Sequence, residues 1–449
     1  MKQTIATLFI LGASLSGFGQ DKNFDLSKYK FPDYKRQELE FNFGAAGMSN
    51  KRTMVEPTVR DDTNVVSGYS NFNSNFDLNY NFNHFTRDRI DYLTSRLSGT
   101  YSYGMNQNYG ETAKAYYPRI YWEMDGSEKA YQKEDKFFLE MLTHLDYSFI
   151  ETKNTYSAAT QENTQKNQNY FNVLVGFGAG TGRMEKVSDL WQTYYILEKL
   201  KAQKSLLRDP EEKDIMEVAR FVSKLKNKRF FDFRLQKIAE LQALDSTLRK
   251  QGLVSDSDML YFTTLNDYWS YGNFPDRESG KVLKFSLSPM YAMNTEKSNV
   301  NDQYFAKFSL ISNASFNCTK QVNLFWERKL SVWISNETLV DTTGGSFEDY
   351  RSNLFRTGAN IGYGFYPDSR TSISGNLGYT GQNLSIYNVR YDTPNEWINR
   401  LFINLSAYYY LSPQLQITGN FGMNYSDKGP DEKNPFYLTY NLGLRYAIF

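Results

Sequence analysis

The stretch Leu415-Gln-Ile-Thr-Gly-Asn-Phe-Gly-Met-Asn-Tyr425 alternates between apolar or aromatic positions and polar or small ones, with Gly419 as the gap in the apolar series. Successive side chains of a β-strand point to opposite faces, so this alternation predicts a strand with one apolar and one polar face. The same period of two recurs far away in the sequence, in Leu39–Phe43 and Phe76–Phe82. We therefore expect the chain to consist mainly of two-faced strands.

The composition favours a membrane barrel over a soluble β-sandwich. The chain has 35 Tyr and 33 Phe, yet its mean hydropathy is −0.60. A membrane barrel combines these properties because half of each strand faces lipid and half faces water. Strand lengths of about ten residues and aromatic strand ends also suit a barrel. The net charge of +1 and pI near 7.6 argue against a nucleic-acid partner.

We predict an all-β membrane barrel of about 14 antiparallel strands, or about 12 if the two least certain strands are dropped. Ala113–Met124 is a doubtful strand, because Pro118 cannot donate to a sheet. Outer-membrane barrels have short periplasmic turns and long outer loops. Counting back from the C-terminus places the short turn Asn83–Arg87 in the periplasm and makes Asn50–Gly68 an outer loop.

The N-terminal residues have the pattern of a secretory signal peptide. Lys2 precedes an apolar run from Ile5 to Leu15, and small residues follow at Gly17 and Gly19. We expect residues 1–19 to be the signal peptide and residues 20–36 to be a polar periplasmic tail. Cys318 is the sole cysteine, so no intramolecular disulfide is expected. The signal peptide together with the predicted barrel predicts a location in the cell outer membrane.

Residues 183–280 depart from the period of two. Apolar residues there recur every three or four positions, as in Ile215, Val218 and Val222 and then in Ile238, Leu241 and Leu244. This spacing predicts amphipathic helices. An all-α periplasmic module is thus inserted between a first part of the barrel, residues 37–182, and a second part, residues 281–449.

Four segments carry a resemblance to a known group. They are Asp25-Leu-Ser-Lys-Tyr-Lys-Phe-Pro-Asp-Tyr-Lys35, Gly182-Arg-Met-Glu-Lys-Val-Ser-Asp189, Arg229-Phe-Phe-Asp232, and Asp267-Tyr-Trp-Ser-Tyr-Gly272 with Arg277 and Gly280. The chain resembles outer-membrane β-barrel proteins of Bacteroidota-type bacteria that have a helical segment between barrel strands. The resemblance implies this architecture and no particular activity.

Charged residues in the polar phase of the strands are expected to line the lumen. Acidic ones gather before the module and basic ones after it, so the two signs should line opposite walls and set up a transverse field. Alternatively, they pair across a narrow lumen and plug it. These residues are Glu38, Glu40, Asp77, Arg96, Glu140, His144, Asp146, Lys284, Lys307, Glu327, Lys329, Arg356, Arg400 and Arg445.

A second set of charges lies where the barrel meets the module. These residues either form buried pairs that dock the module or belong to an ordinary solvated helix start. They are Arg183, Glu185, Asp189, Asp267 and Arg277.

The sequence offers little for catalysis. The glycines of Gly176–Gly182 lack the spacing of a nucleotide loop, and we interpret them as keeping one sheet face bare. His144 shares a face with Glu140 and Asp146, a trio that could bind a metal or act as a base. Polar residues are, however, what any lumen requires. We therefore expect no catalytic residues, no metal and no cofactor.

The favoured function is a passage or export port in outer-membrane lipid, whose module 183–280 docks a periplasmic protein partner or gates the lumen. A non-conducting structural barrel that anchors an assembly is the alternative. A lumenal hydrolase is a second alternative.

Overall fold

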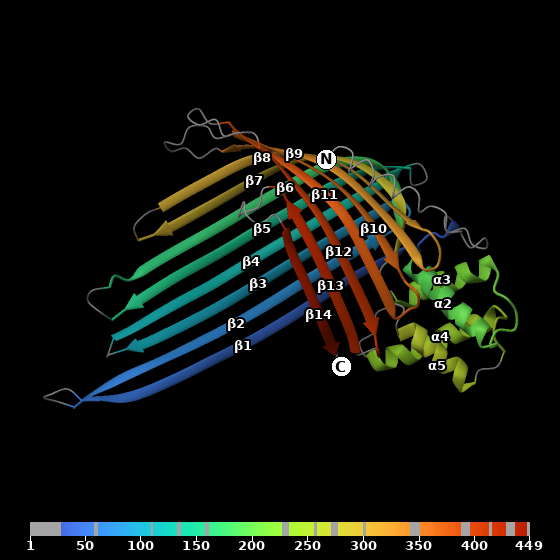
Figure 1. Ribbon diagram of the computed structural model, residues 1–449, viewed down its shortest axis with the longest axis horizontal. Coiled ribbons are helices and arrows are strands. Elements are labelled where there is room, and N and C mark those ends of the chain that lie inside the picture. The colour runs from blue at the N-terminus through green and yellow to red at the C-terminus, as the bar shows by residue number, and fades with distance from the viewer. Residues whose placement is uncertain are drawn as a thin grey trace.

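The computed structural model describes residues 28–57, 62–108, 111–132, 136–157, 161–226, 233–255, 258–270, 277–299, 302–341, 351–387, 396–412, 415–427 and 436–446. Within these ranges the chain forms one antiparallel sheet of 14 strands, with a module of helices at one end (Figure 1). The predicted all-β architecture with an inserted all-α module is therefore confirmed.

The strands before the module are β1 (Tyr34–Pro57), β2 (Asp62–Phe85), β3 (Arg89–Asn108), β4 (Glu111–Gln132), β5 (Phe137–Tyr156) and β6 (Thr164–Lys186). The helices are α2 (Ser188–Ala202), α3 (Glu212–Lys226), α4 (Phe233–Lys250) and α5 (Met259–Ser270). The strands after the module are β7 (Glu278–Ser298), β8 (Asp302–Gln321), β9 (Trp326–Asp341), β10 (Arg351–Phe365), β11 (Thr371–Tyr387), β12 (Glu396–Tyr410), β13 (Leu415–Ser426) and β14 (Phe436–Tyr446).

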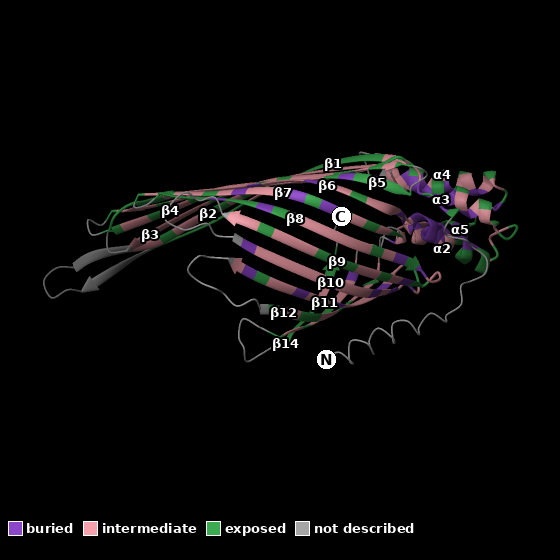
Figure 2. Ribbon diagram, turned by 90° about the horizontal axis from the view of Figure 1, so that it is seen from above, coloured by how far each residue is buried: buried purple, intermediate pink, exposed green. Residues whose placement is uncertain are grey.

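Each strand pairs with the next one in sequence, from β1 to β14. The strands β6 and β7 pair with each other even though the module separates them, and the paired register ends at Lys186 and Glu278. The module is therefore an insertion in a single hairpin. Among the described residues, β1 and β14 do not pair, and Figure 2 shows them at opposite edges of the curved sheet.

Several strands are longer than the roughly ten residues that a membrane crossing needs. β1 and β2 have 24 residues each, so most of the expected outer loop Asn50–Gly68 belongs to their hairpin. Hydropathy marks only the part of a strand that meets lipid, whereas backbone pairing continues through polar sequence. The tip of the hairpin, residues 58–61, lies outside the described residues.

The doubtful segment Ala113–Met124 is part of β4. Its pairing with β5 joins Tyr116 to Lys153 and Arg119 to Ile150, and it skips the two residues between. Pro118 has no N–H group to donate, so the proline interrupts the pairing locally without ending the strand.

Two glycines allow the backbone to pass between the sheet and the module. Gly182 has a φ of +90° and Gly280 a φ of +137°, a region that side chains disfavour. A Cβ atom on Gly182 would lie 2.1 Å from the carbonyl oxygen of Lys281, and one on Gly280 would lie 2.1 Å from that of Arg183. The two chain segments can therefore approach closely only because both positions lack a side chain.

The module has its own apolar core, where buried residues concentrate (Figure 2). Ile215, Val218 and Val222 of α3 are buried in it, as the helical spacing predicts, whereas Ile238 of α4 is 53% exposed. The buried stripe of α4 passes instead through Glu240, whose carboxylate accepts a 2.7 Å hydrogen bond from Trp269 Nε1. Among the described residues, no helix is both long and apolar enough to cross a membrane.

The described part of the N-terminal tail packs on the module. Tyr29 and Phe31 are buried in the module core, although residues 20–36 were expected to form a polar tail. The Tyr29 hydroxyl lies 3.2 Å from Ser223 Oγ, and burial raises the pKa of Tyr29. Lys28 forms a 2.9 Å ion pair with Glu212 of α3. The tail thus ties the module to the start of β1.

Candidate functional site

The two faces of the sheet differ in chemistry. Leu39, Phe41 and Phe43 of β1 are 67%, 65% and 68% exposed on one face. The opposite face, here called the inner face, carries a cavity of about 670 Å³. The cavity is lined mainly by polar side chains, among them Asp125, Ser127, His144, Ser286, Ser288, Asn313, Ser315, Asn317, Ser331 and Ser335.

The strand register places every charged residue expected in the lumen on the inner face. Directly paired residues of adjacent strands share a face. One such series runs Glu38, Asn81, Thr94, Asp125 and His144 across β1 to β5. The other expected residues occupy the same phase of their strands: Glu40, Asp77, Arg96, Glu140, Asp146, Lys284, Lys307, Glu327, Lys329, Arg356, Arg400 and Arg445.

Glu140 is the centre of a buried charge cluster on this face. Its carboxylate lies 2.9 Å from Lys284 Nζ and 3.6 Å from Lys129 Nζ, and it accepts a 2.9 Å hydrogen bond from Ser127. A Cβ atom on Gly178 would lie 3.4 Å from Glu140 Oε2. The bare glycine of β6 therefore lets charges on β5 and β7 meet across it.

Other inner-face charges also pair with near neighbours. Arg96 contacts Asp77 at 2.8 Å, Lys329 contacts Glu327 at 3.0 Å, and Arg356 contacts Glu337 at 3.7 Å. Glu38 pairs with Arg36. Such local pairing weakens the transverse field that the segregation of charges along the sequence suggests. No ion pair joins Glu40, Lys307, Arg400 or Arg445 to another described side chain.

His144 lies between two carboxylates. Its Nδ1 is 2.6 Å from Asp125 Oδ1, and its Nε2 is 2.7 Å from Asp146 Oδ2. The third member of the expected trio, Glu140, is instead held by its two lysines. Glu123 takes its place, since ligand atoms of Glu123, His144 and Asp146 lie within 4.8 Å of one another. The sequence-based interpretation missed Glu123, Asp125 and Lys129 because β4 was doubted, although their alternate positions carried the signal.

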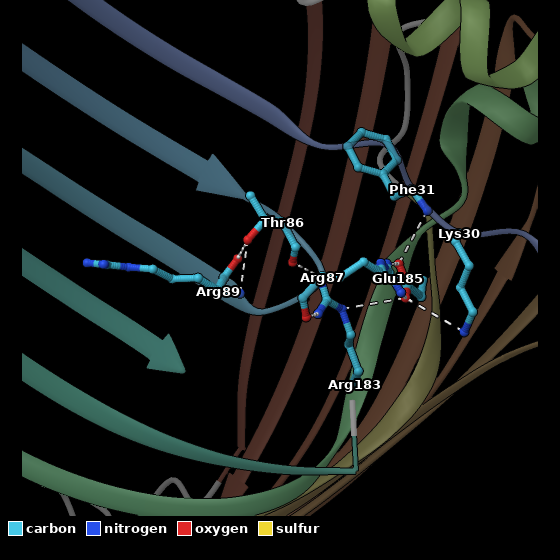
Figure 3. A network of polar contacts seen from close by, with 7 residues as sticks. All are labelled: Lys30, Phe31, Thr86, Arg87, Arg89, Arg183 and Glu185. Carbon is cyan, nitrogen blue, oxygen red and sulfur yellow. Dashed lines mark hydrogen bonds and ion pairs between the residues drawn. The ribbon is translucent and has the colours of Figure 1, made fainter. Parts of the chain in front are cut away.

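The junction is built around Arg183, a buried residue near the end of β6 (Figure 3). Its guanidinium donates to the carbonyl oxygens of Thr86 and Arg87, both at 2.6 Å. The same group lies 4.5 Å from the ring centre of Phe85 and 4.6 Å from that of Tyr131. Arg183 therefore fixes the β2–β3 turn to β6 by hydrogen bonds and cation–π contacts.

Glu185 extends this junction to the tail (Figure 3). Arg87 donates to its carboxylate at 2.8 Å, and the backbone N–H of Phe31 donates to it at 3.4 Å. Lys30 Nζ lies 4.0 Å away. The carboxylate thus joins the β2–β3 turn, β6 and the tail.

Arg277 is the counterpart of Arg183 on the other side of the module. Its guanidinium lies 4.5 Å from the ring centres of both Trp191 and Tyr366. It donates to Gln321 Oε1 at 3.0 Å and to the carbonyl oxygen of Leu324 at 2.9 Å. Burial lowers the pKa of Arg277. Gln321 in turn donates to Glu327, which is fully buried at this end of β9 and not open to a lumen.

The remaining expected junction residues divide into two roles. Asp267 of α5 pairs with Arg370 of the β10–β11 turn, so it joins the module to the sheet. Asp189 pairs with Lys226 at 2.7 Å and therefore joins α2 to α3 inside the module. Arg87 and Tyr366 were not predicted, because they lie in turns, which follow no period. Gln321, the last residue of β8, was not singled out either.

Three solved structures of outer-membrane proteins are similar to this fold. The ferric yersiniabactin uptake receptor FyuA of Yersinia pestis has a TM-score of 0.35 and 7% identity over 88% of this chain and 50% of its own. The transport unit of the autotransporter AIDA-I of Escherichia coli has a TM-score of 0.28 and 9% identity, over 81% of this chain and 91% of its own. A loop-deleted OmpT, an outer-membrane protein of Vibrio cholerae, has a TM-score of 0.24 and 7% identity, over 91% of this chain and 99% of its own.

This chain spans half the length of the FyuA chain. No protein-family model matches it, and no curated protein does. At such TM-scores the similarities place the chain in none of these families.

Proposed function

We propose that the chain is an outer-membrane β-barrel that acts as a passage or export port, with the helical module at its periplasmic end. The observation that carries this proposal is the division of the sheet into two faces. The outer face exposes large apolar side chains such as Leu39 and Phe41, which suits lipid. The inner face holds a cavity of about 670 Å³ beside which serine, asparagine, aspartate and histidine side chains alternate with apolar ones, and the charged residues of the strands lie on this same face, which suits water and polar solutes.

Turn lengths support the orientation. The short β2–β3, β8–β9 and β10–β11 turns all contact the junction residues Arg183 or Arg277, or Asp267 of the module. Short turns are periplasmic in outer-membrane barrels. Unpaired backbone groups are not tolerated in lipid, so the proposal includes closure of the barrel between β1 and β14.

For the module we favour docking of a periplasmic protein over gating. The contacts of Arg277, Tyr195 and Asp267 hold the module against the β8–β9 and β10–β11 turns, which supports a fixed platform more than a swinging gate. The module also exposes large apolar side chains, with Met259 83% and Leu260 52% exposed at the start of α5. Exposed apolar groups of this kind are a feature of protein interaction surfaces.

Conductance of the purified full chain in a planar bilayer tests the port. A matched variant replaces residues 187–277 by an Asn-Gly turn, since Lys186 and Glu278 are already paired and need only a tight hairpin connection. The proposal predicts current steps from both proteins. If the module only docks a partner, the two proteins should give steps of similar size. If the module gates the lumen, the protein without the module should give the larger steps. Arg356→Glu should shift the preference toward cations.

The alternative is a non-conducting barrel that anchors an assembly. The pairing of Glu140 with Lys284, and of Arg356 with Glu337, favours it, because paired side chains stiffen and fill an interior. Folded protein that gives no current steps, with the module and without it, would support this alternative and contradict the port.

A further inference from the structure

A mixed cluster of carboxylates and one imidazole lies on the inner face, away from the module junction. In adjacent strands β4 and β5, Glu123 is paired directly with Asp146, and Asp125 is paired directly with His144. Directly opposed residues have Cβ atoms about 4.5–5.5 Å apart, so the four side chains converge. Because two paired strands position them, little reorganisation is needed for them to act together.

We propose that Glu123, His144 and Asp146 form a binding site for a divalent first-row metal ion of the zinc type. Their ligand atoms lie within 4.8 Å of one another. A tetrahedral zinc ion with bonds of about 2.0–2.2 Å holds its ligands roughly 3.4 Å apart, so small side-chain rotations complete the set. His144 Nε2 and Asp146 Oδ2 lie 2.7 Å apart, so binding of the ion releases the proton that they share to solvent and moves the two atoms apart.

The surroundings orient the ligands as in known metal sites. Asp125 Oδ1 lies 2.6 Å from Nδ1 of His144, so with the N–H on Nδ1 the imidazole donates to Asp125 and Nε2 is left to bind the ion. A carboxylate behind a metal-bound histidine is the usual arrangement. The Tyr121 hydroxyl donates to Asp146 Oδ1 at 3.2 Å, so the other carboxylate oxygen remains for the ion.

An independent observation on β6 points to a ligand. Asn172 is paired directly with Asp146, so Glu123, Asp146 and Asn172 form one row across three strands. Asn172 is only 8% exposed, and its side-chain oxygen has no hydrogen-bond partner in the described part of the chain. Buried polar atoms are normally satisfied, and an amide oxygen can satisfy itself on a cation or on its bound water.

The local charge and donor types select the class of ion. Glu123, Asp125 and Asp146 bring three carboxylates together, and the neighbouring Arg96 is already held by Asp77 at 2.8 Å. Carboxylates alone would suit calcium or magnesium, whereas the imidazole favours zinc and related ions. The proposal does not depend on conduction, since a structural barrel could hold the same ion.

Equilibrium dialysis of the untagged full chain against Zn²⁺ in detergent tests the site. We expect one tightly bound ion per chain in the wild type, its loss in His144→Gln and Asp146→Asn, and affinity weakened about 10- to 100-fold in Asp125→Asn. His84→Gln is the matched control, because His84 also contacts an aspartate, Asp91 at 2.9 Å, in the only other histidine position of the chain. This variant should bind like the wild type.

Three results would overturn the proposal. They are substoichiometric binding by the wild type, equal binding by His144→Gln, and equal competition by Ca²⁺, which would remove the role of the imidazole. Circular dichroism and thermal unfolding of each variant without metal confirm that the sheet is intact. If His144→Gln disturbs the sheet, the zinc affinity of Asp125→Asn tests the proposal instead, because that variant leaves every proposed ligand in place. An affinity equal to that of the wild type would then contradict the proposed role of Asp125.

Discussion

The Tyr195 hydroxyl of α2 donates to the backbone carbonyl oxygen of Tyr366 at 2.9 Å and so joins the first helix of the module to the β10–β11 turn. The ring of Tyr366 also covers the guanidinium of Arg277. The apolar core of the module continues into Phe31 of the tail and Phe85 of β2. The module and the end of the sheet therefore share one packed interior.

Replacing Arg277 should loosen the module without unfolding the sheet. Arg277→Met keeps most of the side-chain volume but leaves Gln321 and the Leu324 carbonyl oxygen without their donor. Hydrogen bonds to a charged group contribute about 1.5–3 kcal/mol, so we expect roughly 3 kcal/mol less local stability. Hydrogen exchange in α2 and α5 should then accelerate by about a hundredfold.

Arg208→Met is the control for this measurement. Arg208 is a module residue that pairs with Asp214 at 2.6 Å and is exposed. It makes no contact with the sheet among the described residues, so its replacement should leave exchange in α2 nearly unchanged. Equal acceleration in both variants would show that Arg277 has no special role in docking.

Alkaline pH should release the module. Burial raises the pKa of Tyr195 from its ordinary value of 10.0 to about 12, and burial raises the pKa of Tyr268 and Tyr366 too. Because the folded pKa is the higher one, the neutral hydroxyls stabilise docking fully below pH 10, and this stabilisation is lost as the pH rises toward 12. A tyrosinate titration of wild type minus Tyr195→Phe should show one group ionising near pH 12. A difference titration centred at pH 10 would mean that Tyr195 is solvated.

Thiol labelling can establish which side of the membrane the module faces. Lys213 has a side chain that is 82% exposed on α3, and Gln303 is exposed at the opposite end of the sheet, on β8. In a Cys318→Ser background, Lys213→Cys should resist an impermeant reagent on intact cells and react after the outer membrane is opened. Gln303→Cys should react on intact cells. The reverse pattern would invert the proposed orientation.

Closure of the barrel can be tested by cross-linking its two edge strands. Leu39 of β1 is 67% exposed, and Tyr440, Leu442 and Leu444 of β14 are similarly exposed. In membranes, Leu39→Cys combined with a cysteine at one of these β14 positions should form a disulfide, because lipid does not tolerate open edges. A cysteine at Phe177, which is exposed on β6 far from either edge, should not cross-link to β14. Absence of any β1–β14 product would indicate a seam that stays open.

The sequence predicted the sheet well because a period of two needs only local information. In Leu415–Tyr425 and in Phe76–Phe82 the alternation itself defines both faces. It predicted the packing at the end of the sheet poorly. Tyr29 and Phe31 lie among charged residues with no period, and their burial depends on a module that begins more than 150 residues later. The partners of Arg183 and Arg277 include the backbone carbonyl oxygens of the turn residues Thr86, Arg87 and Leu324, which no residue pattern can reveal.

The inner face shows the same limit. The alternation along β5 placed Glu140, His144 and Asp146 on one face of the sheet, but it could not show which of these side chains contact one another. Lys129 and Lys284 reach Glu140 from two other strands, and Glu123 replaces it beside His144 because of the β4–β5 register. Register between strands depends on the whole hairpin and is weakly encoded in a single strand.

The helical spacing of α4 predicted Ile238 and Leu244 equally as residues of the module core. Leu244 is fully buried and Ile238 is 53% exposed, because the buried stripe of α4 reaches back four residues from Leu244 to Glu240. Leu244→Ala should therefore cost about 2–5 kcal/mol of local stability through the cavity it leaves. Ile238→Ala, the matched control on the same helix, should change it by less than about 0.5 kcal/mol. Hydrogen exchange of α3 and α4 in the full chain measures both, and equal effects would mean that α4 turns Ile238 toward the core.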